Sequence, residues 1–296
     1  MIEIWKKTEL DRLTRAHGFR CSKAWGQNFL VDRNVLDKVV QGAELSKEDH
    51  VTEIGPGAGA LTVLLARSAG SVTAVEIDKR LIPMLQEVTE GLENVTIIRD
   101  DILEYLKRHN GDGSLCVQEH KENRPHCVEK LVGNLPYYIT TPIIAGLFEP
   151  GKDGIRPAPP ELAVFMVQKE VAERLLSPPG KKTYGAITVL VQYYADIELL
   201  STVSQDVFTP RPNVDSAIIR LRPKDLSGDD KETASKMFRL VRSGFDMRRK
   251  TLRNSLAASG FPAEDLASAL EISGIDPVRR AETLSPRDFY DLASKL

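Results

Sequence analysis

Two short segments of this sequence combine residue types that could bind a ligand and act on it. The first is the glycine-rich turn Glu53 to Thr62, which joins an apolar run to an amphipathic one. Glycine has no Cβ, so backbone can pass beneath a ligand, and the free N–H groups of the following helix point into that space. Glu76 ends the next expected strand, where its carboxylate could accept both ribose hydroxyls of an adenosine. The segment therefore predicts a nucleotide-binding strand-turn-helix.

The second segment, Gly133 to Tyr138, contains Asn134, Leu135, Pro136 and Tyr137. It offers an amide oxygen, a backbone carbonyl stiffened by proline, and an aromatic ring. An amine on a flat base needs these groups, because its lone pair is delocalised into the ring. Two acceptors that hold its hydrogens favour the pyramidal nitrogen, and a stacked ring keeps the base in line. The alternative is a type I turn with core aromatics.

The glycines alone leave the ligand open. Many α/β proteins turn tightly at such a place without a ligand, and Gly55-x-Gly57-x-x-Ala60 also satisfies the looser dinucleotide fingerprint. Glu53, the acid ahead of the turn, resembles the first motif of S-adenosylmethionine (SAM) methyltransferases, whose ligand carries a sulfonium and an amino acid instead of a pyrophosphate. An NAD-dependent oxidoreductase would bind NADH and would leave the second segment without a role.

These segments need a scaffold that brings the ends of several strands together. From His50 onward, apolar runs alternate with helix-period segments, which predicts a mostly parallel sheet with helices on both faces. We expect strands at residues 50–54, 71–75, 95–98, 128–132, 162–167, 197–203 and 216–221. The expected fold class is α/β, a Rossmann-like SAM-dependent methyltransferase sheet of seven strands with a small C-terminal all-α domain.

The chain divides near residue 224. Beyond Pro223 only helical patterns occur, and residues 225–231 form a linker that is rich in glycine and aspartate. We expect a catalytic domain at 1–224, with a helical lead-in at 1–48, and a helical substrate-binding domain at 225–296. Within the lead-in, residues 26–30 have no periodicity and predict a packed loop or a functional one.

The formal net charge of −2 hides an uneven distribution. Residues 236–256 hold seven basic residues against one acid, Asp246. Apolar positions alternate with these charges, so one helical face packs while the other is exposed. Such a surface suits a polyanion, and a solvated face is the alternative. The candidate RNA contacts are Arg248, Arg249, Lys250 and Arg253.

Composition places the chain among ordinary globular proteins, since 296 residues with 42% hydrophobic content can bury a large core. No stretch reaches the roughly 18 consecutive apolar residues of a membrane span, and the N-terminus lacks the apolar segment of a signal peptide. Three cysteines are too few for a disulfide framework and fit a reducing compartment. We therefore expect a cytoplasmic protein with no membrane partner.

Three further features have two interpretations each. Asp101 follows the third strand and could accept the exocyclic amine of an adenine, or it could cap the next helix. Phe208 precedes closely spaced prolines and could form a second stacking face, or it could be a core residue. The insertion 109–127 contains Cys116, His120, His126 and Cys127 but lacks a paired Cys-x-x-Cys knuckle, so a solvated insertion is favoured over a zinc site. We expect no metal.

Several segments together, in order and over nearly the whole chain, resemble the ribosomal RNA adenine dimethyltransferases. They are residues 26–30, 53–62, 75–78, 134–137, 208–216 and 248–256. The resemblance implies a SAM-dependent enzyme that dimethylates N6 of two adjacent adenosines in a loop near the 3′ end of small-subunit ribosomal RNA. It implies cofactor contacts at Asn28, Leu30, Gly55, Gly57, Glu76, Asp101 and Asn134. It also implies a catalytic motif at Asn134, Leu135, Pro136 and Tyr137, with Phe208 as the stacking partner.

Two rivals remain on the same fold. One is the antibiotic-resistance branch, which acts on large-subunit ribosomal RNA, and Leu135 with residues 248–256 favours the small-subunit enzyme instead. The other is a non-catalytic RNA-binding or transcription factor, against which the intact glycine turn, Glu76 and Asn134 argue. The expected partner is small-subunit ribosomal RNA within a pre-assembled small ribosomal subunit, and the expected state is a monomer.

Overall fold

The computed structural model describes residues 2–21, 26–109, 116–117, 126–127, 130–149, 159–226 and 228–296. The chain forms two compact units. The first comprises Met1–Leu147, Arg156–Ala172 and Glu198–Pro223, and the second comprises Phe148–Ile155, Glu173–Ile197 and Lys224–Leu296. The second unit thus takes in residues 173–197 as well as the C-terminal helices.

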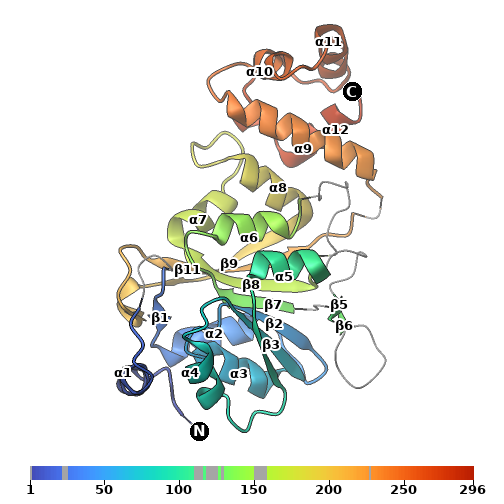
Figure 1. The fold of residues 1–296 in the computed structure, drawn as a ribbon. Coiled ribbons are helices and arrows are strands. Elements are labelled where there is room, and N and C mark those ends of the chain that lie inside the picture. The colour runs from blue at the N-terminus through green and yellow to red at the C-terminus, as the bar shows by residue number, and fades with distance from the viewer. Residues whose placement is uncertain are drawn as a thin grey trace. The chain divides into compact units, whose positions relative to one another are not determined.

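A seven-stranded, mostly parallel sheet organises the fold, which confirms the expected α/β class (Figure 1). Its order is β4-β3-β2-β7-β8-β11-β9. The strands are β2 (His50–Ile54), β3 (Ser71–Glu76), β4 (Val95–Arg99), β7 (Lys130–Asn134), β8 (Leu162–Gln168), β9 (Ala195–Val203) and β11 (Ser216–Pro223). The pairs β2–β3, β3–β4, β2–β7 and β7–β8 are parallel, whereas β11 runs antiparallel to β8.

The order of these strands fixes where a ligand can bind. From β2 the chain proceeds outward through β3 and β4 and then returns to place β7 on the other side of β2. The connections therefore diverge between β2 and β7, and in open α/β sheets this switch point opens a crevice at the carboxyl ends of the strands. The glycine-rich turn follows β2 and the Asn134 segment follows β7, so both face that crevice.

Helices cover both faces of the sheet in the first unit. Figure 1 shows α2 (Arg33–Gly42), α3 (Ala60–Ser68) and α4 (Ile82–Val88) on one face, with α5 (Ile102–His109) and α6 (Thr140–Gly146) on the other. Helix α3 is buried continuously from Leu61 to Ala66 and joins one hydrophobic core with α1 (Lys7–Ala16), α2 and the central strands. This core holds the strand ends rigidly beneath the crevice.

The lead-in has more regular structure than its sequence indicated. Helix α1 ends near Gly18, whose φ is 60°, and Asp32 caps α2 by accepting from the N–H of Val35 at 3.0 Å. Between them lies β1 (Phe29–Leu30), which pairs antiparallel with β10 (Phe208–Thr209), just after the short 3-10 helix η2 (Gln205–Val207). The prediction of a loop at residues 26–30 was wrong for Phe29 and Leu30, because a two-residue strand has no periodicity and its partner lies far away in sequence.

Most of the insertion 109–127 lies outside the described residues. The solvated segment predicted there, and the zinc site that was its alternative, therefore lie outside them too. What is described is a two-stranded pairing of β5 (Cys116–Val117) with β6 (His126–Cys127). Over the described part of the chain, no group of three or more His, Cys, Asp or Glu side chains could hold a metal ion. None of the helices described there has the length and apolar character needed to cross a membrane.

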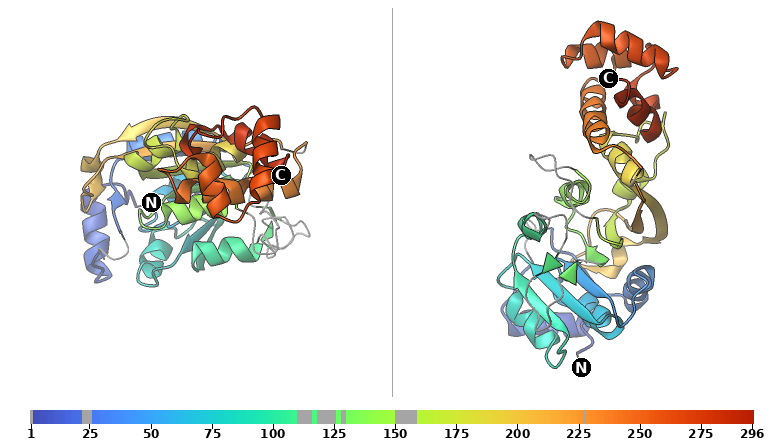
Figure 2. Two further views of the ribbon diagram at one scale, coloured as in Figure 1. Left: turned by 90° about the horizontal axis from the view of Figure 1, so that it is seen from above. Right: turned by 90° about the vertical axis from the view of Figure 1, so that its right-hand side faces the viewer.

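The second unit is helical around α9, as expected for the C-terminal part (Figure 2). Its helices are α8 (Ala186–Tyr194), α9 (Lys231–Asp246), α10 (Leu252–Ala258), α11 (Ala263–Ile272), the 3-10 helix η3 (Ala281–Thr283) and α12 (Pro286–Ala293), while α7 (Lys169–Leu175) begins in the first unit. Helix α9 packs against α8, α10 and α12. Stacked rings join these helices, with Tyr193 on Tyr290 and Tyr194 on Phe238.

Candidate active site

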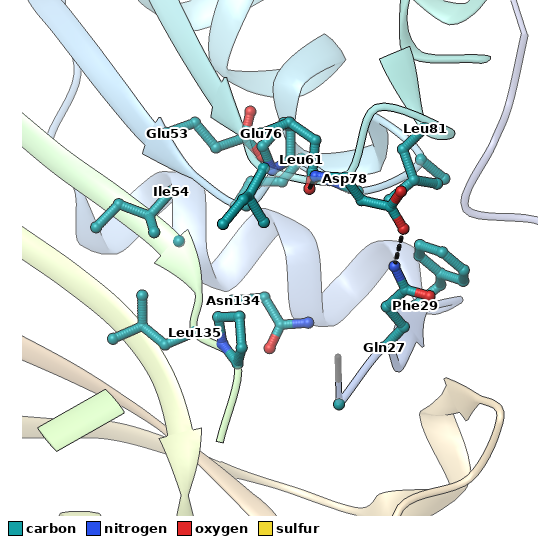
Figure 3. Close-up of a pocket in the computed structure, with 18 of the residues that line it drawn as sticks. Gln27, Phe29, Glu53, Ile54, Leu61, Glu76, Asp78, Leu81, Asn134 and Leu135 are labelled. Carbon is teal, nitrogen blue, oxygen red and sulfur yellow. Dashed lines mark hydrogen bonds between the residues drawn. The ribbon is translucent and has the colours of Figure 1, made fainter. Parts of the chain in front are cut away.

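A cavity of the first unit opens at the switch point of the sheet. Its walls come from residues 26–30, 53–58, 75–78, 100–103 and 133–139. Figure 3 shows Glu53, Glu76 and Asp78 on one side of it and Asn134 and Leu135 facing them. The cavity thus joins the two segments that sequence patterns singled out.

Nearly all of the predicted cofactor and catalytic residues line this cavity. They are Asn28, Leu30, Gly55, Gly57, Glu76, Asp101, Asn134, Leu135, Pro136 and Tyr137. Phe208 is not among the lining residues. It is 3% exposed and belongs to the hydrophobic core. Its burial agrees with the core interpretation that was left open, and a stacking role for it stays a prediction.

The turn after β2 depends on glycine. Gly55, Gly57 and Gly59 have φ values of 64°, 58° and 88°, in the left-handed region that disfavours side chains. A Cβ on Gly57 would also lie 3.1 Å from the ring of Phe29. The turn therefore lets the backbone approach the cavity, and it presents the N–H of Gly57 to the carboxylate of Glu76 at 3.1 Å.

Glu76 is held in place by backbone donors. Its side chain accepts from the N–H of Gly57 and, at 2.8 Å, from the N–H of Asp78. The residue is 5% exposed, and burial raises the pKa of its carboxyl group, which the two backbone hydrogen bonds oppose. An ionised carboxylate has about four acceptor positions. The remaining positions leave room for ligand donors, and the predicted contact to ribose hydroxyls stays a prediction.

Glu53 is an acid of the cavity wall that is buried with one carboxylate oxygen lacking a hydrogen bond within the described part of the chain. It is 1% exposed, and its Oε2 atom has no hydrogen-bond partner among the described residues. Burial, with a smaller contribution from the charge of Glu76, raises the pKa of Glu53 to about 8. A buried acceptor without a partner is costly unless a ligand supplies a donor or a cation. The amino-acid ammonium of SAM is such a group, so the residues present fit this cofactor.

Asn134 is oriented by the lead-in segment. Its Nδ2 donates to the carbonyl of Asn28 at 3.2 Å, and Nδ2 of Asn28 donates in turn to the carbonyl of Gly26 at 3.0 Å. With the amide nitrogen engaged, the Oδ1 atom of Asn134 is left to accept from a ligand. Close packing beneath it requires glycine, because a Cβ on Gly133 would lie 2.7 Å from the carbonyl oxygen of Ile54.

Two tyrosines follow Asn134 in the cavity wall. The hydroxyl of Tyr137 lies 2.8 Å from Oγ of Ser216, and burial raises the pKa of its phenol. This bond fixes the ring of Tyr137 as a flat wall. Tyr138 lines the same cavity but is 51% exposed, so its ring lies at the mouth. Sequence patterns gave Tyr138 no role, since a single tyrosine after a turn carries no periodic signal.

Gln27 and Asp78 form a link that sequence reasoning missed. Nε2 of Gln27 donates to Oδ2 of Asp78 at 2.8 Å (Figure 3). Asp78 also pairs with Arg80 at 2.6 Å. The guanidinium of Arg80 and these hydrogen bonds lower the pKa of Asp78, so it is ionised at neutral pH. The link ties the lead-in to the end of β3. The position of Asp78 two residues after Glu76 was the available clue.

Asp101 caps a helix and also lines the cavity, so a contact to an adenine amine stays a prediction. Its Oδ1 accepts from the N–H of Leu103 at 2.8 Å, which is a cap for α5. The residue also lines the cavity, so its second carboxylate oxygen is available to a ligand.

The four basic residues singled out in the second unit are not equivalent. Arg248 donates to two backbone carbonyls and to the carboxylate of Glu282. Arg249, Lys250 and Arg253 are exposed, and their side chains have no partner among the residues that the structure describes. Of these four, Arg248 is thus bound internally and the other three are free within the described part of the chain.

A Rossmann-like sheet with a glycine turn, a buried acid at the end of β3 and a cavity at the switch point is typical of SAM-dependent methyltransferases. Comparison with known proteins narrows this class. The model of the ribosomal RNA adenine dimethylase family matches residues 18–296, and the chain belongs to that family. The family is SAM-dependent and acts on ribosomal RNA.

Similar proteins support this assignment over the full length. Ribosomal RNA small subunit methyltransferase A of Lachnoclostridium phytofermentans is 43% identical over 97% of this chain and 95% of its own. The protein of the same name from Bacillus mycoides is 44% identical over 100% of this chain and 98% of its own.

Two solved structures share the fold. A dimethyladenosine transferase from Plasmodium falciparum has a TM-score of 0.70 at 27% identity, covering 89% of this chain and 95% of that one. The 23S rRNA methyltransferase ErmE has a TM-score of 0.64 at 27% identity, covering 90% of this chain and 99% of that one.

Proposed function

We propose that this protein transfers methyl groups from SAM to N6 of two adjacent adenosines near the 3′ end of small-subunit ribosomal RNA. The observation that carries the proposal is the amide of Asn134, held by Asn28 at the end of β7 and facing the cavity that Glu76 lines. Relatives named small subunit methyltransferase A, at 43% and 44% identity, support the choice of substrate.

Three acids at the ends of β2, β3 and β4 would hold the cofactor. Glu76 would accept the ribose hydroxyls, Asp101 the adenine amine, and Glu53 the ammonium of the amino acid. Asn28, Leu30, Gly55 and Gly57 form the surrounding wall. When bound, SAM supplies a methyl group that is already activated on a sulfonium. The protein then needs only to position the acceptor.

The acceptor amine would be held by Asn134 and Leu135. The Oδ1 atom of Asn134 and the carbonyl of Leu135, which Pro136 stiffens, accept the two N6 hydrogens. Tyr137 stacks on the base, with its ring fixed by Ser216. Phe208 as a second stacking face would require it to leave the core position it has here.

No histidine-type base is needed for the transfer. As N6 of the adenine attacks, it gains positive charge and its proton becomes acidic enough to leave to solvent. A monomethylated N6 still carries one hydrogen for Asn134 or Leu135 to hold. The same site can therefore complete the second transfer.

The second unit, which comprises the expected helical domain 225–296 together with residues 173–197, would hold the RNA while the first unit takes an unpaired adenine. Arg249, Lys250 and Arg253 are free cations suited to a phosphate backbone. Bases in a loop can be splayed out at low cost. We further propose that the substrate is a pre-assembled small subunit and that the enzyme acts as a monomer in the cytoplasm.

The main competing function is methylation of large-subunit ribosomal RNA, for which the similarity to ErmE is the specific observation. Labelled SAM should be incubated separately with unmodified small subunits and with naked large-subunit RNA, using Asn134→Ala as the inactive control. We expect label only in the small-subunit RNA. Label in large-subunit RNA alone would support the competing function, and failure to bind SAM would indicate a non-catalytic protein.

A further inference from the structure

Arg248 has a different environment from its basic neighbours in the second unit. Its Nη2 atom lies 3.1 Å from the carbonyl oxygen of Lys182, 3.1 Å from that of Tyr184, and 2.9 Å from a carboxylate oxygen of Glu282. Its guanidinium also lies 6.0 Å from the ring centre of Phe245. Glu282 offsets the charge of Arg248, and all three acceptors lie against its Nη2 atom, so the side chain is anchored within its own unit.

The carbonyls that Arg248 binds belong to a short loop before α8. Gly180, with a φ of 86°, donates its N–H to the carbonyl of Glu282 at 2.7 Å. The N–H of Tyr184 donates to the carbonyl of Lys181 at 3.0 Å, and the buried Tyr184 hydroxyl donates to the carbonyl of Leu284 at 2.9 Å. Arg248 therefore completes a set of bonds that fixes the loop within its own unit.

The fixed loop presents two further cations. Lys181 and Lys182 are exposed, and neither side chain has a partner among the residues that the structure describes. Because Arg248 reaches the backbone of Lys182, the loop and the start of the basic segment Arg249–Lys250 lie within one arginine side chain of each other. The fold thus brings together two basic pairs that are far apart in sequence.

We propose that Lys181 and Lys182 bind the RNA phosphate backbone together with Arg249 and Lys250, and that Arg248 is a positioning residue for this surface. The proposal rests on the proposed function, since the RNA is the methylation substrate. Four unpaired cations on a hydrogen-bonded backbone match a polymer that carries a regular row of negative charges. An arginine suits the positioning role because its fork can serve several acceptors at once.

The lysine pair can be tested by its effect on salt dependence. Each lost phosphate contact should flatten the plot of log K against log salt by roughly 0.7 to 0.9. For Lys181→Ala/Lys182→Ala, we expect weaker binding to unmodified small subunits and a slope reduced by roughly 1.4 to 1.8. The matched control, Lys231→Ala/Lys295→Ala, removes the same charge from other exposed sites of this unit and should leave the slope unchanged.

The positioning role needs a double-mutant comparison. If Arg248 acts through the loop, Arg248→Ala by itself weakens RNA binding. Added to Lys181→Ala/Lys182→Ala, it should cause no further loss of RNA affinity. In the same double mutant, Arg249→Ala should weaken RNA binding by as much as it does in the wild-type protein. Arg248→Lys should not restore binding, because the lysine side chain ends one bond short of the Nη2 position that reaches all three acceptors. Full additivity of Arg248→Ala would instead mean that it contacts RNA directly.

The outcomes separate this inference from the proposed function. If the wild-type protein methylates small subunits but the lysine pair behaves like its control, the inference is overturned and the function stands. If the wild-type protein binds RNA through the lysine pair but transfers no methyl group, the function is overturned. Circular dichroism of each variant verifies that the helical unit remains folded.

Discussion

Glu53→Gln should stabilise the ligand-free protein at high pH. Glu53 is fully buried without a partner for Oε2, and its pKa rises from 4.5 to about 8. One pKa unit corresponds to about 1.36 kcal/mol, so ionising this carboxyl in the folded state costs at most roughly 5 kcal/mol relative to the unfolded chain. Allowing for relaxation around the charge, we expect a difference of about 2 to 4 kcal/mol.

The sign follows from proton binding. Because the folded pKa of Glu53 lies above the unfolded one, the folded protein holds a proton that the unfolded chain releases between about pH 4.5 and pH 8. Its contribution to stability is complete below pH 4.5 and is lost as the pH rises through 8. Glutamine binds no such proton, so the variant should lose less stability over this window. The raised pKa of Glu76 acts in the same direction but is present in both proteins.

Urea unfolding at pH 5, 6, 7 and 8.5 measures the effect. Trp5 is buried in the first unit, so its fluorescence follows that unit. The free energy of unfolding of Glu53→Gln should exceed that of the wild type by an amount that grows as the pH rises. If the difference in unfolding free energy between the two proteins stays constant across the pH series, a partner neutralises Glu53. The argument that Glu53 suits an ammonium ligand would then lose its support.

Three further predictions concern the cavity. Glu76→Ala should weaken SAM binding by about 1.5 to 3 kcal/mol in calorimetry, and Glu76→Gln by less, because the carboxylate accepts ligand hydroxyls; unchanged affinity would remove Glu76 from the site. Asn134→Ala should lower the single-turnover methyl-transfer rate by roughly a hundredfold or more with little loss of RNA affinity; equal losses in both would indicate mere positioning of the RNA. Gly133→Ala should lower the melting temperature of the first unit, since its Cβ would lie 2.7 Å from the carbonyl oxygen of Ile54; an unchanged melting curve would show that β2 and β7 can separate without cost.

The sheet could be predicted from sequence because its strands are short, apolar and regularly separated by amphipathic helices. The strand predicted at 50–54 agrees with β2, and those predicted at 71–75 and 95–98 each extend one residue further. Parallel strands buried on both faces are continuously apolar, which is a local signal. The placement of Glu76 and Asn134 in one cavity then followed from the rule that ligands bind at the carboxyl ends of strands.

Contacts between distant segments could not be predicted. Three such contacts join residues that carry no periodic signal of their own. They are the pairing of Phe29 and Leu30 with Phe208 and Thr209, the hydrogen bond from Gln27 to Asp78, and the bonds of Arg248 to its loop. For the same reason Phe208 was given a possible stacking role, whereas strand pairing buries it in the core. Charge density alone grouped Arg248 with Arg249, although only tertiary structure distinguishes them.

The central claim is that a single active site transfers two methyl groups to N6 of each of two adjacent adenosines. Unmodified small subunits should be incubated with excess SAM and this protein, and the RNA should then be digested and its nucleotides mapped by mass spectrometry. We expect dimethyladenosine at two neighbouring positions near the 3′ end, with monomethyladenosine only at early times, and both products should form roughly a hundredfold or more slowly with Asn134→Ala. A reaction that stops at monomethyladenosine, or that modifies a different base, would contradict the account.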